Sequence, residues 1–117
     1  MTPDTRPAPK PLTPATFHIL VTLADAPAHG YHIKRLVEER TRDAVRLGAG
    51  TLYSGLRRME KDGLIEEVDA PAGEEEGAGA RWRFYGITPR GREALTDEIG
   101  RLEADLAAAR AVAPRPA

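Results

Sequence analysis

Apolar side chains recur at the spacing of an α-helix in the first half of the chain. Thr13 followed by Pro14 is typical of a helix start, because a threonine side chain can cap the first turn and proline suits its first position. A first helix is therefore expected from this point to just before Pro27. Its apolar positions are Phe17, Leu20, Val21 and Ala24.

A second apolar stripe follows the tripeptide His29-Gly30-Tyr31 and predicts a second helix. Its buried positions are expected to be Ile33, Leu36 and Val37, while Lys34, Arg35, Glu38 and Glu39 face water.

Glycines at 48 and 50 indicate a turn, after which Thr51 is expected to cap a third helix. The apolar stripe of this helix is Leu52, Leu56 and Met59. Gly63 is expected to end it, since glycine readily adopts the positive φ found after helix ends.

Two short β-prone stretches follow, at residues 64–68 and 81–87. Between them lies a glycine-rich loop with Glu74, Glu75 and Glu76, so a long hairpin with an acidic tip is predicted. Thr88-Pro89 repeats the helix-start pattern and opens a last helix that is expected to run to about Arg110.

Three helices, a hairpin and a long helix predict a mainly α fold, a winged helix-turn-helix followed by one long helix. The expected divisions are a disordered proline-rich tail at 1–11, a winged helix-turn-helix domain at 12–88, a dimerisation helix at 89–111 and a disordered tail at 112–117.

Composition narrows the choice of function. The chain has no cysteine, which excludes disulfides and thiolate metal sites, and no apolar run near the ~20 residues that span a membrane. No apolar stretch typical of a signal peptide opens it, so a cytoplasmic protein without membrane contact is expected. The net charge is −1, so any contact with nucleic acid must rest on a local basic patch.

The third helix carries such a patch. At about 100° per residue, its polar arc lies opposite the apolar stripe and could present cations to DNA. This arc could also be only the solvated face of an amphipathic helix, but the preceding turn and the following hairpin favour DNA recognition. The expected DNA-contacting residues are Thr51, Tyr53, Ser54, Arg57, Arg58 and Lys61, with Arg81 and Arg83 at the base of the wing.

The last helix has apolar residues spaced four, three, four and three apart, which is a heptad seam. Part of this seam is expected to pack on its own domain and the rest against a second copy of the chain. The expected dimerisation residues are Leu95, Ile99, Leu102, Leu106 and Ala109.

Several short motifs, in this order and spacing, resemble the PadR family of bacterial transcription regulators, in its short form with a single C-terminal helix. They are Leu12-Thr13, His29-Gly30-Tyr31 with Ile33, Gly50-Thr51-Leu52-Tyr53 with Leu56, Met59-Glu60, Gly63-Leu64-Ile65, Tyr85, Ile87-Thr88-Pro89 and Gly91-Arg92.

The resemblance implies a homodimer, usually a repressor, that binds double-stranded DNA at an inverted-repeat operator. It also implies that a small-molecule effector of unknown identity can release the DNA. Two features differ from the family pattern: the acidic run in the wing, and a last helix without an aromatic residue.

Three other functions fit the sequence less well. His29 and His32 lie one helical turn apart, but two histidines without thiols make a poor metal site, so no metal, no other cofactor and no metal sensing are expected. Ser54 lacks the surroundings of a catalytic nucleophile, so no enzyme is expected. The main alternative is a winged-helix protein-interaction module that does not bind DNA, which the near-neutral charge and acidic wing favour.

Overall fold

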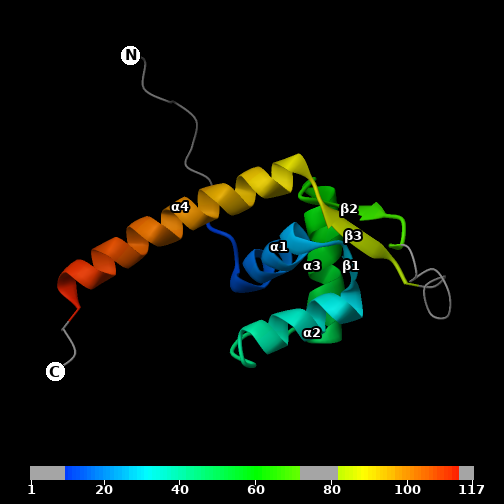
Figure 1. Ribbon diagram of the computed structural model, residues 1–117, viewed down its shortest axis with the longest axis horizontal. Helices are drawn as coiled ribbons and strands as arrows, with labels where there is room; N and C mark the ends of the chain where they lie inside the picture. Colours follow the sequence, from blue (N-terminus) through cyan, green and yellow to red (C-terminus); the bar gives the residue numbers. More distant parts are fainter. Residues whose placement is uncertain (1–9, 72–81, 114–117) are drawn as a thin grey trace, which may run out of the picture.

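The computed structural model describes residues 10–71 and 82–113 (Figure 1). Residues 1–9 and 114–117, which make up most of the two expected tails, lie outside the described residues, as do Arg81 and the acidic run Glu74, Glu75 and Glu76. The helices are α1 (Pro14–Asp25), α2 (Gly30–Arg40), α3 (Ala49–Lys61) and α4 (Pro89–Val112). The strands are β1 (Ala28–His29), β2 (Ile65–Val68) and β3 (Phe84–Ile87). The mainly α winged-helix class with a long last helix is confirmed.

The sheet is antiparallel with strand order β1-β3-β2. The predicted pairing of two consecutive strands is confirmed, with Ile65 opposite Ile87 and Val68 opposite Phe84. Two details of the prediction were wrong. β3 begins only at Phe84, so Trp82 and Arg83 precede the strand, and the sheet has a third strand, β1, that the sequence pattern did not indicate.

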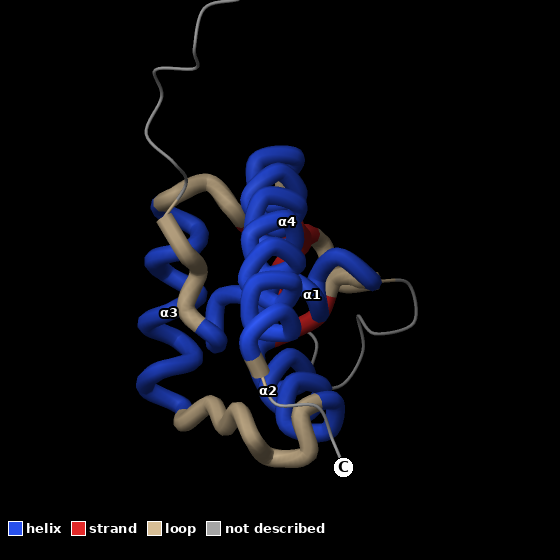
Figure 2. The backbone as a smooth tube through the Cα atoms, turned by 90° about the vertical axis from the view of Figure 1, so that its left-hand side faces the viewer, coloured by secondary structure: helices blue, strands red, loops and turns tan. Residues whose placement is uncertain are grey.

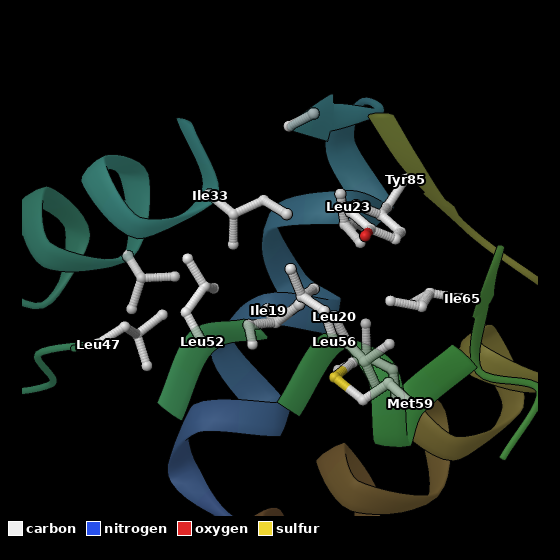
Figure 3. Packing of buried hydrophobic residues seen from close by; sticks show 13 residues of the cluster. Ile19, Leu20, Leu23, Ile33, Leu47, Leu52, Leu56, Met59, Ile65 and Tyr85 are labelled. Carbon is white, nitrogen blue, oxygen red and sulfur yellow. The ribbon is translucent and has the colours of Figure 1, made fainter. Parts of the chain in front are cut away.

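The core lies between α1, α2, α3 and the sheet (Figure 3). The predicted stripe of α3 is fully buried, and so are Ile33 and Val37 of α2, whereas Leu36 is half-buried. In α1 the buried face is shifted around the helix axis relative to the predicted one. The most buried apolar side chains are Ile19, Leu20 and Leu23, and Phe17, Val21 and Ala24 pack at the edge of the core. Burial of this one cluster, which all three helices share, holds them together.

Two helix starts follow the predicted capping chemistry. The hydroxyl of Thr13 accepts a hydrogen bond from the Thr16 amide at 3.2 Å, and the hydroxyl of Thr88 accepts one from the Gly91 amide at 3.0 Å. The start of α3 was predicted wrongly. Gly48, not Thr51, is its N-cap residue, and the Gly48 carbonyl already accepts from the Leu52 amide at 2.8 Å. Thr51 therefore lies inside the first turn.

α4 crosses the domain at its beginning and leaves it afterwards. Its first turns pack closely on the chain before β2, because a Cβ atom at Gly91 would lie only 2.1 Å from the carbonyl oxygen of Leu64. Leu95 and Glu98 are buried, whereas every described residue from Leu102 onward is exposed. The second half of the helix projects beyond the other elements in Figure 1, and in Figure 2 α4 lies in front of the other three helices. α4 continues to Val112, two residues past the expected end.

Candidate nucleic-acid interface

The outer face of α3 carries the polar side chains that the sequence singled out. Thr51, Tyr53, Ser54, Arg57, Arg58 and Lys61 are all exposed, and the apolar stripe faces the core. Glu60 is half-buried at the edge of this face. The face therefore presents three cations, a phenol and two hydroxyls to solvent, which are groups that donate hydrogen bonds to phosphates and base edges.

The ends of α3 fix how this face is presented. Gly48 enters the helix in an extended conformation, and Gly63 leaves it with a φ of 77°, the left-handed conformation predicted for it. The Leu64 amide then donates to the carbonyl of Met59 at 2.9 Å, which turns the chain directly into β2. The helix and the wing are thus joined by a tight connection.

The beginning of α2 lies against the same face. His29 caps α2, since its Nδ1 accepts a hydrogen bond from the His32 amide at 3.1 Å. A Cβ atom at Gly30 would lie 3.1 Å from Cε1 of Tyr53, so the phenol ring of α3 packs on the backbone of α2 at this point. The first turn of each helix therefore belongs to one continuous surface.

The residues before β3 complete this surface. The indole of Trp82 contacts the imidazole of His29, with ring centroids 4.0 Å apart and the ring planes tilted by 48°, and the Phe84 ring meets His29 edge-on at 5.3 Å. Arg83 follows Trp82 and is exposed. Of the two arginines expected there, only Arg83 is among the described residues.

These segments enclose a cleft of about 290 Å³, which we call the wing cleft. Its walls come from α2, α3 and the chain before β3: Gly30, Tyr31, Tyr53, Arg57, Trp82 and Arg83. His29 and Tyr85 complete the lining. Burial raises the pKa of the Tyr85 hydroxyl, helped by nearby Glu60 and opposed by a hydrogen bond from Arg83.

Sequence reasoning missed two exposed members of this surface, Tyr31 and Trp82. Both are large aromatic residues with about half of their surface in water, at 57% and 45% exposure. Large exposed aromatic residues are uncommon outside binding surfaces, so the position of Trp82 beside Arg83 was an available indication.

The predicted dimerisation seam divides into two parts. Leu95 is buried within its own domain. Ile99, Leu102, Leu106 and Ala109 are exposed along α4, and so is Val112 at its end. The exposed part continues the heptad spacing for more than two turns without cover from the described residues.

Two kinds of feature are absent from the described ranges, 10–71 and 82–113. No three of their histidine, aspartate and glutamate side chains come together as a metal site. No helix among them is both long and apolar enough to cross a membrane.

Comparison with known proteins places these features in a family. A family model described as "Transcriptional regulator PadR-like family" matches residues 19–97. The transcriptional regulator Rv3488 of Mycobacterium tuberculosis is 38% identical over 86 residues, which are 74% of this chain and 73% of that protein. A 37.1 kDa protein in transposon TN4556 of Streptomyces fradiae is 40% identical over 80 residues, which are 68% of this chain but only 20% of that protein.

Solved structures agree. A PadR family transcription regulator from Clostridium difficile R20291 superposes with a TM-score of 0.68 at 25% identity, over 82% of this chain and 94% of that one. A transcriptional regulator from Clostridium thermocellum gives a TM-score of 0.69 at 23% identity, over 86% and 90% of the two chains, and shows the same fold. The chain belongs to the PadR-like family of transcriptional regulators.

Proposed function

We propose that the protein is a homodimeric DNA-binding regulator that represses transcription from an inverted-repeat operator. The observation that carries this proposal is the outer face of α3. Arg57, Arg58 and Lys61 stand in water there, directly opposite a fully buried apolar stripe. A net charge of −1 for the whole chain makes this concentration of cations a local property of the helix.

In the proposed complex α3 enters the major groove. Tyr53 and Ser54 lie in the first half of the helix, Arg57 follows one turn later, and an arginine fork can bond the O6 and N7 of guanine. Arg58 and Lys61 would bind flanking phosphates, with Thr51 near the helix start. Arg83, and with it Arg81, would reach the DNA backbone from the wing base. The acidic run at Glu74, Glu75 and Glu76 would keep the wing tip away from phosphates.

The dimer is proposed to form through the exposed part of α4. Leu102 and Leu106 leave apolar surface in water that a second α4 would cover, and the three-four spacing with Ile99 and Ala109 suits a pair of helices. A two-fold pair of α3 helices then reads two half-sites about one turn of DNA apart. Repression, and its relief by a small molecule, are proposed from the family to which the chain belongs.

The test is titration of the protein against the DNA upstream of its own gene and against a scrambled duplex, at several salt concentrations. Binding of the upstream DNA should be tighter, and its log affinity should fall linearly with log salt, with a slope set by the number of phosphates contacted. A protein that binds neither duplex, even at low salt, would contradict the proposal and favour the protein-interaction module.

A further inference from the structure

The chain that leaves α3 and the first turn of α4 meet at close range. A Cβ atom at Gly91 would lie 2.1 Å from the carbonyl oxygen of Leu64, and one at Gly63 would lie 3.6 Å from Cδ of Arg90. Figure 1 shows the end of α3 next to the start of α4. Backbone packed against backbone cannot be rearranged by a change of side-chain rotamer, so this joint favours a single geometry.

One hydroxyl bonds both sides of the joint. Oγ1 of Thr88 donates to the carbonyl of Gly63 at 2.6 Å and accepts from the Gly91 amide at 3.0 Å. The backbone amide of Thr88 donates to the Leu64 carbonyl at 3.1 Å. A threonine hydroxyl has one proton to donate and lone pairs to accept, and here it uses both between two helices.

A helix cap requires only half of this arrangement. The hydroxyl of Thr13 accepts from the Thr16 amide and donates to the Thr16 hydroxyl, so both bonds stay within the start of α1. The bond from Thr88 instead reaches Gly63, 25 residues away, where α3 ends with a φ of 77°. This bond therefore ties the orientation of α3 to that of α4.

The direction of α4 is fixed at two places. The pairing of Ile65 with Ile87 holds the chain up to Thr88, but it does not determine the direction that α4 takes afterwards. Burial of Leu95 and Glu98 attaches the helix farther along. Two attachments define a direction, whereas loss of the first would let the helix pivot about the second.

The angle between the helices has a consequence for DNA. α3 carries the proposed DNA-contacting face, and the exposed part of α4 carries the proposed dimer seam, so this angle sets how far apart the two α3 helices of a dimer lie. One added base pair moves a half-site by about 3.4 Å and turns it by about 35° around the DNA axis. A dimer with a fixed angle therefore matches one half-site spacing.

We propose that Thr88 is a positioning residue, whose hydroxyl fixes the angle between α3 and α4 and thereby selects the spacing of the DNA half-sites. The selection of spacing rests on the proposed function, whereas the fixed angle does not.

Three substitutions separate the two bonds of the hydroxyl. Thr88→Ser keeps both bonds, and Thr88→Val keeps neither. Thr88→Asp keeps an acceptor for the Gly91 amide, but at neutral pH it has no proton to donate to Gly63. Thr13→Val is the matched control, because it removes a helix cap whose bonds, among the described residues, stay within one helix.

The angle is measured without DNA. The chain has no cysteine, so spin labels can be attached through Arg58→Cys on α3 and Glu103→Cys on α4, both at exposed positions. Labelled chains are diluted with unlabelled ones, so that double electron–electron resonance reports the distance within one chain. The parent protein, Thr88→Ser and Thr13→Val should give one narrow distribution. Thr88→Asp and Thr88→Val should give one about twofold broader or more, because the bond that holds the angle is missing.

The selection of spacing is measured by anisotropy. The duplexes carry the operator footprinted in the upstream DNA, or the same operator with one base pair added or removed between its half-sites. The wild type should prefer the natural spacing about tenfold or more, and Thr88→Asp should prefer it about threefold or less, a change within the range of one hydrogen bond. Affinity for a duplex with a single half-site should be the same in both, because one head binds it whatever the angle.

Circular dichroism checks that each variant is folded, and if Thr88→Val does not fold, Thr88→Asp with its intact cap decides. An unchanged distance distribution in Thr88→Asp, or a broadened one in Thr88→Ser, would overturn the role of the hydroxyl. A broader distribution with an unchanged spacing preference would overturn the selection of spacing, and so would an equal loss of affinity for every duplex, which indicates a structural role alone. If the wild type binds no DNA, the proposed function is wrong and the distance measurement still decides whether Thr88 fixes the angle.

Discussion

The backbone amide of Leu12 donates a hydrogen bond of 3.1 Å to Oε1 of Glu98, which joins the chain just before α1 to the middle of α4. Glu98 is only 5% exposed, and its other oxygen pairs with the guanidinium of Arg101. A buried carboxylate needs such partners because its charge is otherwise costly to remove from water. This contact secures α4 at the point where the helix leaves the domain.

Removing the Glu98 carboxylate should destabilise the fold. Glu98→Ala leaves the Leu12 amide without its acceptor, and the free energy of unfolding should fall by about 1–3 kcal/mol. Glu98→Gln keeps an acceptor oxygen, so the free energy of unfolding should fall by less. Urea unfolding at pH 7 measures both, and Glu103→Ala, at an exposed position of the same helix, is the control. Equal stability of Glu98→Ala and Glu103→Ala would show that the contact contributes nothing.

Acid should destabilise the protein through two carboxylates. The Arg101 guanidinium, together with the Leu12 amide, holds the pKa of Glu98 below its ordinary value of 4.5. The Lys34 ammonium, together with the Leu47 amide, lowers the pKa of Glu38 in the same way. A carboxyl with a lowered pKa binds its proton less readily in the folded state, so its stabilisation is complete above about pH 4.5 and is lost as the pH falls through the folded value.

The measurement is the free energy of unfolding between pH 7 and pH 3. It should fall with acidification, and Glu98→Gln should reduce the slope below pH 4.5. A slope in Glu98→Gln that matches the wild type would assign the acid sensitivity to other groups.

Two glycines of α4 should respond in opposite directions to alanine. Gly91→Ala places a methyl group 2.1 Å from the carbonyl oxygen of Leu64 and should destabilise by more than about 2 kcal/mol, because backbone on both sides must move. Gly100→Ala meets nothing within 4 Å among the described residues and should stabilise by about 0.5–1 kcal/mol through helix propensity. Thermal unfolding of the two variants side by side tests this, and the same sign for both would contradict it.

Operator recognition should depend on the outer face of α3. Arg57→Ala should cost about 1–3 kcal/mol of operator affinity and relax the preference at one base pair. Lys61→Ala should weaken binding to all sequences alike and reduce the salt slope by about one. Titration of each folded dimeric variant against operator and scrambled DNA separates the two effects. Wild-type affinity in both Tyr53→Ala and Arg57→Ala would remove α3 as the reading helix.

The oligomeric state should depend on the outer half of α4. Leu102→Glu with Leu106→Glu places like charges in the proposed seam, and light scattering should then give the mass of one chain instead of two. Both positions are exposed within the protomer, so circular dichroism and the melting temperature of the diluted protein should change little. Glu103→Gln is the matched control. A double variant that remains dimeric would place the interface elsewhere.

Contacts between residues close together in the sequence could be predicted, whereas contacts between distant residues could not. Thr13 and Thr88 were correctly predicted as helix caps because the bonds involved span only three residues. The start of α3 was misplaced because the glycines at 48 and 50 suggested a turn, although a helix can begin at Gly48 without a side-chain cap. β1 has two residues and hence no periodicity, and only its pairing with β3 defines it.

The candidate site likewise has one part that the sequence predicts and one part that it does not. The exposed face of α3 follows from helical spacing alone, so its residues were predicted together. The wing cleft needs three segments brought together by the fold, and no pattern within one segment indicates the contact between the rings of Trp82 and His29. Part of the seam on α4 was expected to pack on its own domain, and it is the packing of α4 on α1 that decides which residue does so, namely Leu95.

The pairing of β1 with β3 also has a mechanical consequence. Ala28 lies opposite Tyr85 and His29 opposite Phe84, so the wing is bonded to the residues that begin α2 and cannot tilt independently of the helices. The domain is therefore a stiff head, and the part of α4 that leaves it, residues 102–112, is a lever arm of about 16 Å. Tilting such an arm by ten degrees about its far end carries the head by about 3 Å. In the proposed dimer, tolerance for half-sites at different spacings would therefore be set by the bending stiffness of α4.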